Sequence, residues 1–394
     1  MADSTATGKE FLGATAGDTV YFISGTYNPG NAPGWATPAW NPSNSGSSGS
    51  PITFKRLSGT CTILSNDVGP PFGANSRNYI TWDGFTGSKS DVHNDYVRFD
   101  TTDHCQLLHC DITGSSVTAS INVCVAAEDT TYLTVENCKL HGSKGTHTQN
   151  SAGYMSYSTS NCTIQNNEIY NNHTGIFEKS NGSHNTYKNN FFHDNDTCGF
   201  LVGTETTGST QHNISVYQNV FIDHIWEAIN ITGALTKSEI YIYNNVIYNM
   251  TSTAIYTQGG AIADRQIYNN IIYTAGTSFN LNSSDTSTYN DYNSIYDYGS
   301  LKISDATITL ANWISTYGFD ANSITVDPEL SNVGGTSATD YKLGSYSGSN
   351  PCYGTGKSDV TIGAYITGSE EIGPESDGAT PFTIPSPGYL YITS

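Results

Sequence analysis

The chain has 394 residues, a formal net charge of −20 and 13% charged residues, about half the usual share for a soluble domain. A negative field of this size argues against a nucleic-acid partner, and no apolar run reaches the roughly 18 to 20 residues of a membrane span. The aromatic content of 12% argues against a disordered chain, and the abundance of Asn, Ser, Thr and Gly argues against a helical bundle.

The first 60 residues predict two strands separated by a long loop. "AGDTVYFISGTYN" at 16–28 reads as a strand and turn, and "GSPITFKRLSG" at 49–59 as the next strand. Residues 29–50 between them are rich in Pro, Gly and Ser and contain Trp35 and Trp40. The N-terminus has no basic region or apolar segment of a signal peptide, so we expect a mature domain or release by another route, as in a virion.

One phrase then recurs from Ile80 onward at spacings of 23 to 29 residues: an apolar residue, two residues, a small polar one, any residue, and another apolar one. The polar position forms a column: Asp83, Cys110, Cys138, Asn167, Asn190, Asn219, Asn245, Asn270 and Asn293. A variable period with short period-2 strands is typical of a parallel β-solenoid, in which insertions go into the corners. Equivalent residues then stack about 4.8 Å apart, and a buried Asn column hydrogen-bonds along the stack.

These copies resemble the right-handed parallel β-helix of the pectate-lyase-like superfamily. The resemblance continues in "TLANWISTYGFDANSITVDPEL" at 309–330 and in "DYKLGSYSGSNPCYGTG" after it. It implies an all-β, single-stranded right-handed parallel β-helix of about ten or more coils, with a short helix and an irregular C-terminal segment. The superfamily holds polysaccharide lyases, glycosidases, esterases and tailspikes, so the fold alone does not name a reaction.

We divide the chain into an N-terminal part (1–77), the regular β-helix (78–300), a closing segment (301–367) and a tail with a docking strand (368–394). The tail is the expected point of attachment to another molecule, and a homotrimer of the tailspike kind stays open. Eight Cys lack the spacing of a zinc site. Cys110 and Cys138 share a column, which fits either a disulfide or a reduced stack.

Two outward rows of tyrosines follow from the alternation of the strands. If the residue two positions after the polar column points inward, the residue three after it and the residue two before it point outward. Aromatic rows suit stacking on sugar rings, and they equally suit stacking between coils. The candidate substrate-binding residues are Tyr170, Tyr217, Tyr243, Tyr248, Tyr268 and Tyr273, together with Glu178.

The position four after the column carries Asp194 and Asp223 on adjacent coils, between corner insertions at about 142–151 and 203–212. A close carboxylate pair serves a hydrolase as acid and as nucleophile or base, or binds a cation such as calcium together with Asp196. A lyase instead needs a base, for which Lys179, Lys188 and Arg265 are the candidates. The other candidate catalytic residues are His193, His224 and Glu227. The competing interpretation is a set of solvated corner residues.

Two functions follow from these observations. The first is an extracellular β-helix that binds a polysaccharide or surface glycan and cleaves it by lyase or hydrolase chemistry, with calcium as an optional cofactor. The second is a non-enzymatic structural or adhesion protein, such as a virion spike or a cell-surface component. An acidic protein repels acidic polymers, which favours a neutral glycan or a calcium-dependent one.

Overall fold

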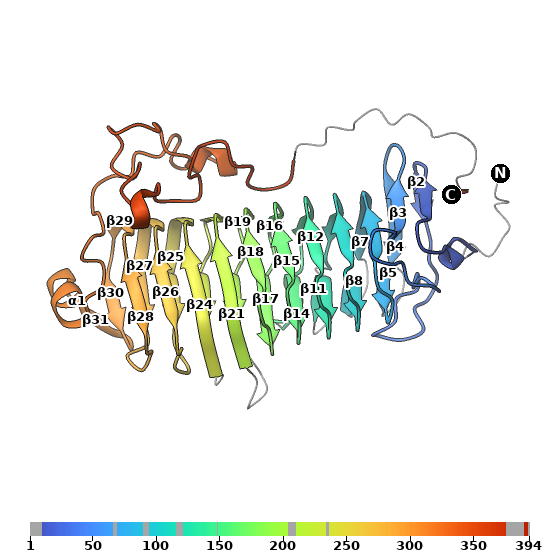
Figure 1. Ribbon diagram of the computed structural model, residues 1–394, viewed down its shortest axis with the longest axis horizontal. Helices are drawn as coiled ribbons and strands as arrows, with labels where there is room; N and C mark the ends of the chain where they lie inside the picture. The colour runs from blue at the N-terminus through green and yellow to red at the C-terminus, as the bar shows by residue number, and fades with distance from the viewer. Residues whose placement is uncertain are drawn as a thin grey trace. The chain divides into compact units, whose positions relative to one another are not determined.

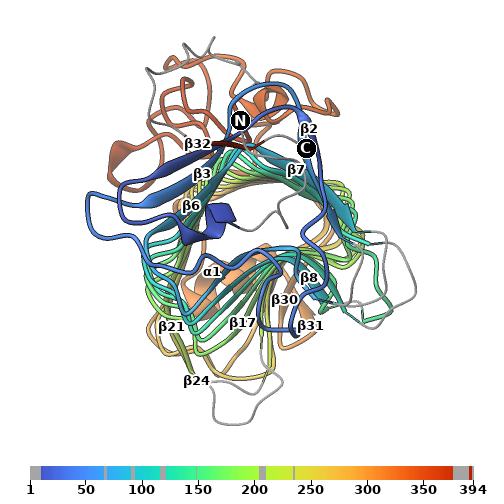
Figure 2. The same cartoon turned by 90° about the vertical axis from the view of Figure 1, so that its right-hand side faces the viewer.

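A computed structural model describes residues 10–65, 69–89, 94–115, 121–147, 149–203, 210–233, 236–375 and 390–392. The chain forms two compact units, unit 1 (residues 1–173 and 374–394) and unit 2 (residues 174–373). Both are right-handed parallel β-solenoids (Figures 1 and 2). Their strands belong to two hydrogen-bonded sheets, of which the first is named A and the second is divided below into two rows of strands, B1 and B2. The predicted all-β solenoid is therefore confirmed.

Unit 1 opens with the short 3₁₀ helix η1 (Glu10–Gly13). Its sheet A contains β1 (Thr19–Phe22), β3 (Ile52–Arg56), β6 (Ile80–Asp83), β9 (Gln106–Leu108), β12 (Thr134–Glu136), β15 (Thr163–Gln165) and, beside β1, β32 (Leu390–Ile392). Sheet B1 contains β2 (Gly25–Tyr27), β4 (Cys61–Ser65), β7 (Phe85–Lys89), β10 (Asp111–Thr113), β13 (Lys139–His141) and β16 (Glu168–Tyr170). Sheet B2 contains β5 (Phe72–Asn75), β8 (Asn94–Asp100), β11 (Asn122–Glu128) and β14 (Ala152–Tyr157). The strand of the tail thus pairs with its own chain.

Unit 2 repeats this arrangement. Its sheet A contains β18 (Thr186–Lys188), β21 (Thr210–Tyr217), β24 (Thr236–Tyr243), β26 (Arg265–Tyr268) and β28 (Thr288–Asp291). Sheet B1 contains β19 (Phe191–His193), β22 (Val220–Ile222), the first halves of β25 (Val246–Thr257) and β27 (Ile271–Leu281), and β29 (Ser294–Tyr298). Sheet B2 contains β17 (Thr174–Ser180), β20 (Cys198–Val202), β23 (Glu227–Ile231), the second halves of β25 and β27, β30 (Leu301–Ile303) and antiparallel β31 (Ala306–Ile308).

The asparagine column is a buried hydrogen-bond ladder, as predicted. In unit 2 the backbone N–H groups of Asn190, Asn219, Asn245 and Asn270 each donate to the side-chain oxygen of the next Asn, at 2.9–3.1 Å. The ladder ends at Asn293, whose amide donates to Asp320 Oδ1 at 2.9 Å. The column therefore satisfies the corner's polar groups and is not a catalytic row.

Aromatic residues close the ends of the interior. In unit 1, Phe11 of η1 packs edge-on against Trp40 and Phe22. In unit 2, helix α1 (Leu310–Tyr317) begins at the cap residue Thr309 and ends at Gly318 in a left-handed conformation, as expected for a C-cap glycine. Its Trp313 stacks on Phe279 at 5.7 Å between ring centres. The short helix expected near residue 309 is thus confirmed.

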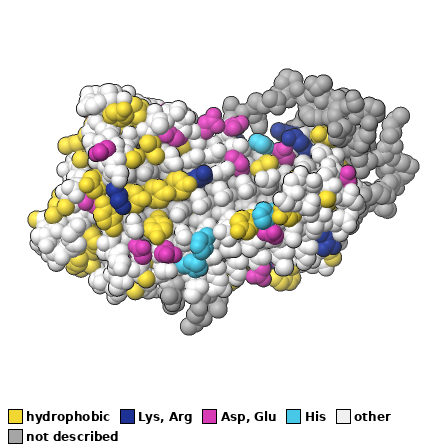
Figure 3. Space-filling view, in the orientation of Figure 1, with side chains coloured by type: hydrophobic (Ala, Val, Ile, Leu, Met, Phe, Trp, Pro, Cys, Tyr) yellow, Lys and Arg dark blue, Asp and Glu magenta, His cyan; other side chains and the backbone are white. Residues whose placement is uncertain are grey.

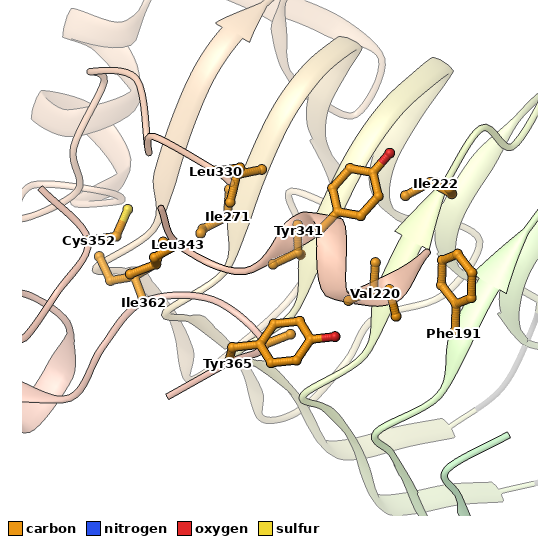
Figure 4. Packing of buried hydrophobic residues seen from close by; sticks show 13 residues of the cluster. Phe191, Val220, Ile222, Ile271, Leu330, Tyr341, Leu343, Cys352, Ile362 and Tyr365 are labelled. Carbon is orange, nitrogen blue, oxygen red and sulfur yellow. The ribbon is translucent and has the colours of Figure 1, made fainter. Parts of the chain in front are cut away.

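The C-terminal part of unit 2 covers the outer face of its sheet B1 (Figure 4). Residues 319–373 contain the 3₁₀ helices η2 (Ala338–Tyr341) and η3 (Lys357–Asp359). They form a second apolar core with the outward residues of β19, β22, β25 and β27. Its members include Phe191, Val220, Val246, Ile271, Leu330, Tyr341, Leu343, Cys352, Ile362 and Tyr365.

All eight cysteines are free and buried, which decides the alternative left open for Cys110 and Cys138 in favour of a reduced stack. The N–H of Cys110 donates to Cys138 Sγ at 3.4 Å. Charged side chains are sparse on the face drawn in Figure 3, in line with their 13% share of the sequence. Within the described ranges, no helix has the length and apolar character needed to cross a membrane.

Candidate functional site

The column that carries Asp194 and Asp223 is a left-handed corner of the backbone. These two residues have φ of 52° and 57°, and Asn171, Asn249 and Asp297 in the same column have 53°, 57° and 51°. Asn and Asp adopt this conformation more readily than other residues with a Cβ. The backbone alone therefore accounts for Asp at these positions.

The two carboxylates also have separate partners. Asp194 Oδ2 lies 2.7 Å from Nδ1 of its neighbour His193, and Asp223 Oδ1 accepts from Asn249 Nδ2 at 2.5 Å. Among the described residues no three His, Cys, Asp or Glu side chains gather closely enough to hold a metal ion, so Asp194, Asp196 and Asp223 do not form the expected trio. Calcium binding by this protein stays a prediction.

Four of the candidate site residues are buried. Glu178 is fully buried and accepts from Asn185 Nδ2 at 3.2 Å and from the Tyr187 hydroxyl. Lys179 is 5% exposed, and Arg265 is 0% exposed with its Nε 2.9 Å from Asp285. Burial therefore argues against the substrate-binding role expected for Glu178 and against the lyase-base role considered for Lys179 and Arg265.

His224 is the fourth buried candidate, and its side chain lies in the interior of the solenoid. Its Nδ1 accepts from the N–H of Asn195 at 3.4 Å, and the imidazole is 1% exposed. Burial, and then the neighbouring His193, lower the pKa of His224 to about 3. The ring is neutral at physiological pH and packs in the interior, so its burial argues against the acid–base role expected for it.

The tyrosine row on sheet A of unit 2 stacks on itself. Tyr217 and Tyr243 lie 4.7 Å apart with rings 7° from parallel, and Tyr243 and Tyr268 lie 5.1 Å apart at 6°. Lys357 Nζ lies 4.3 Å from the ring centre of Tyr268. The neighbouring rings occupy one another's faces, so the row presents edges and hydroxyls rather than the flat faces that sugar stacking needs. Lys188 belongs to the same row, paired with Tyr217.

The remaining candidates are spread over other faces. Tyr248 and Tyr273 pack against the C-terminal core, Tyr248 with its ring 5.3 Å from that of Tyr341. Glu227, on sheet B2, accepts from Asn230 at 3.3 Å, and burial raises its pKa. Tyr170 lies in unit 1. Unit 2 therefore distributes its predicted residues over both B sheets, sheet A, a corner and the interior, and does not assemble them into one site. The insertion at 203–212 lies largely outside the described residues.

A group of which sequence reasoning found only Tyr170 lies on sheet B1 of unit 1. The outward side chains of β10, β13 and β16 are Asp111, Thr113, Lys139, His141, Glu168 and Tyr170, and we call this set the charged face. The strand register pairs Asp111 with Lys139 and Lys139 with Glu168. Within unit 2 the corresponding positions are Phe191, Val220, Val246 and Ile271, which are apolar and covered.

The charged face brings acid–base groups into contact. His141 Nε2 lies 3.0 Å from Asp111 Oδ1, and Lys139 Nζ lies 3.3 Å from Glu168 Oε2. The Tyr170 ring stacks on His141 at 4.6 Å, 8° from parallel. Burial, and then the charges of Glu168 and Asp111, raise the pKa of Tyr170 to about 12, so its hydroxyl remains a donor at neutral pH. Asp111 and Lys139 are about half exposed.

A sequence signal for this face exists one position after the polar column. That position carries Asp111, Lys139 and Glu168, and then changes to Phe191, Val220, Val246 and Ile271. Charged residues on an outward strand position indicate solvent, whereas a run of apolar ones indicates cover. Reading this column would have separated the open face from the covered one.

Comparisons with known proteins agree with the architecture. Residues 95–263 match the family model for a right handed beta helix region, and no curated protein matches the sequence. A mannuronic acid specific polysaccharide family 6 lyase from human gut microbiota superimposes with a TM-score of 0.50 at 15% identity, over 76% of this chain and 80% of that one.

Two further lyase structures are similar. The family 6 polysaccharide lyase Pedsa3628 from Pseudopedobacter saltans gives 0.46 at 12% identity, over 95% of this chain and 97% of that one. Pectate lyase Pel9A gives 0.49 at 14%, over 90% and 89%. At these identities the likeness shows the fold alone. The parallel strand topology and the family match over residues 95–263 give the chain a right-handed parallel β-helix fold.

Proposed function

We propose that this protein binds a polysaccharide across the charged face of unit 1 and hydrolyses it there. The observation that carries the proposal is the ordered set of Asp111, Lys139, His141 and Glu168 on adjacent coils. The fold that the chain shares with a polysaccharide lyase supports a polysaccharide as the ligand class. Such polymers lie outside cells, so the proposed location is extracellular, secreted or on a particle surface.

The Cα spacing of Asp111 and Glu168 favours hydrolysis with inversion. Asp111 and Glu168 occupy the same column two coils apart, which separates their Cα atoms by about 9.6 Å. This Cα separation lies close to the upper end of the roughly 6.5–9.5 Å between the carboxyl groups of inverting glycosidases, and it is well above the about 5 Å of retaining enzymes. One carboxyl group protonates the glycosidic oxygen as its bond to the anomeric carbon breaks. The other takes a proton from the water that attacks this carbon.

The charge of the face favours a neutral glycan. Lys139 is the only lysine or arginine among the six residues of the charged face, and it is paired with Glu168. β-Elimination from a uronate needs cationic groups to neutralise the sugar carboxylate as well as a base. The positioning of Asp111 by His141, and the hydroxyl of Tyr170 as a donor to sugar oxygens, fit hydrolysis of a neutral polymer better.

The test measures reducing-end release and absorbance near 232 nm (roughly the band of unsaturated products) on a panel of neutral and acidic polysaccharides. Asp111→Asn and Glu168→Gln are each expected to lower turnover by about 100-fold or more. Asp194→Asn and Asp223→Asn are matched controls, because Asn also suits their left-handed corners. Loss of activity in the controls alone would move the site to unit 2. Binding without turnover on any polymer would support the adhesion protein instead.

A further inference from the structure

We infer that Trp35 is a glycan-binding platform on unit 1, separate from the charged face and next to sheet B2. The inference rests on the proposed function only in taking a glycan as the ligand. Its starting point is the indole of Trp35, which lies over the guanidinium of Arg98 in β8 with 4.8 Å between Arg98 Cζ and the ring centre.

Trp35 is exposed although the chain buries most of its tryptophans. Its exposed fraction is 61%, whereas Trp40, Trp82 and Trp313 are at most 3% exposed; Trp226 is the other exposed one, at 57%. A large aromatic side chain in water on a surface loop forgoes the free energy of burial. Such residues are enriched where a surface binds a partner or ligand.

The loop that carries Trp35 is held in place. Asn75 Nδ2 donates to the carbonyl of Ala36 at 3.0 Å, and the N–H of Ala39 donates to the carbonyl of Pro70 at 2.9 Å. Trp40, five residues on, is buried against Phe11 and Phe22. The indole is therefore presented by a fixed backbone, which lowers the entropy cost of binding.

Arg98 fixes the ring from one side and is itself held by three carboxylates. Its Nη1 lies 2.6 Å from Asp95 Oδ2, its Nη2 lies 2.9 Å from Asp100 Oδ2, and Nη2 also contacts Glu128 Oε2. Arg98 is 4% exposed, whereas the side chains of Asp100 and Glu128 are 14% and 34% exposed. The result is a rigid aromatic surface with carboxylate oxygens near its rim.

This combination fits a pyranose without a carboxylate. The C–H face of the sugar packs on the indole, and its hydroxyls donate to the oxygens of Asp100 and Glu128. Three carboxylates against one guanidinium leave a local charge of about −2, which repels uronates. The structure therefore points to a neutral glycan, the class proposed for the charged face.

The test is affinity electrophoresis of the full chain in gels that contain neutral polysaccharides or polyuronate. Trp35→Ala is expected to weaken binding of a neutral polymer at least tenfold, about 1.4 kcal/mol. Trp226→Ala, the matched exposed control, is expected to bind as the wild type does. Wild-type affinity in Trp35→Ala, weakening only in Trp226→Ala, or equal binding of polyuronate by the wild type would overturn the inference.

The double variant Asp111→Asn/Glu168→Gln separates this inference from the proposed function. If binding that depends on Trp35 persists while the double variant cleaves normally, the proposed catalytic face fails and the platform stands. If the double variant loses cleavage and Trp35→Ala keeps full affinity, the platform fails and the catalytic face stands.

Discussion

Replacing Asn245 with Ala is expected to destabilise the protein by several kcal/mol. Its side chain takes part in five hydrogen bonds of 2.9–3.1 Å: donors to the carbonyls of Val216 and Tyr243 and to Asn270 Oδ1, and acceptor from the backbone and side chain of Asn219. The variant leaves the Asn219 N–H and the Val216 carbonyl without these partners inside the coil. Each such buried group costs about 1–3 kcal/mol, so the expected loss from the two groups is about 2–6 kcal/mol.

The assay is equilibrium unfolding in urea, followed by circular dichroism, with Asn249→Ala as the matched control. Asn249 is exposed, has φ of 57° and makes one side-chain hydrogen bond, to Asp223. Its replacement is expected to cost about 1 kcal/mol, from the left-handed backbone and the lost bond. If Asn245→Ala is no more destabilising than Asn249→Ala, the ladder does not support the coils as described.

Three further predictions concern stability. Because burial lowers the pKa of His224 to about 3 while an unfolded His titrates near 6.5, wild-type stability should fall as the pH drops from about 6.5 toward 3. His224→Asn should show a smaller loss of Tm between pH 7 and about pH 4.5, and an equal loss would contradict a neutral buried ring. Arg98→Met leaves Asp95 buried without its cation and should cost about 3 kcal/mol in urea unfolding; an unchanged midpoint would count against the network. Leu343→Ala should cost about 2–5 kcal/mol and make residues 319–373 the first site of limited proteolysis, and protection equal to wild type would argue against the second core.

The fold was predictable because every coil repeats the same pattern of apolar and polar positions, and this pattern sets the register between neighbouring coils. The apolar positions around Asn219, Asn245 and Asn270 recur with the same local spacing, and parallel stacking needs nothing more to align them. The role of the Asn column followed from the same repeat, since a buried amide that recurs once per coil has its partners one coil away.

The candidate site was less predictable, for two physical reasons. Asp194 and Asp223 looked like a catalytic pair because their spacing is visible in the sequence, whereas the left-handed backbone that explains them is not. Tyr248 and Tyr273 looked open because the segment that covers them, around Tyr341, lies far along the chain. A distant segment that covers a strand face leaves only an indirect signal in the sequence of that face. Here the signal is the change from charged residues such as Lys139 to apolar ones such as Val220, one position after the polar column.

The anomeric configuration of the first product tests the central claim most directly. Proton NMR of a cleaved neutral oligosaccharide reports this configuration before mutarotation. Carboxylates two coils apart, Asp111 and Glu168, predict inversion. Retention would contradict the account, because it requires carboxyl groups about 5 Å apart, the spacing of neighbouring coils.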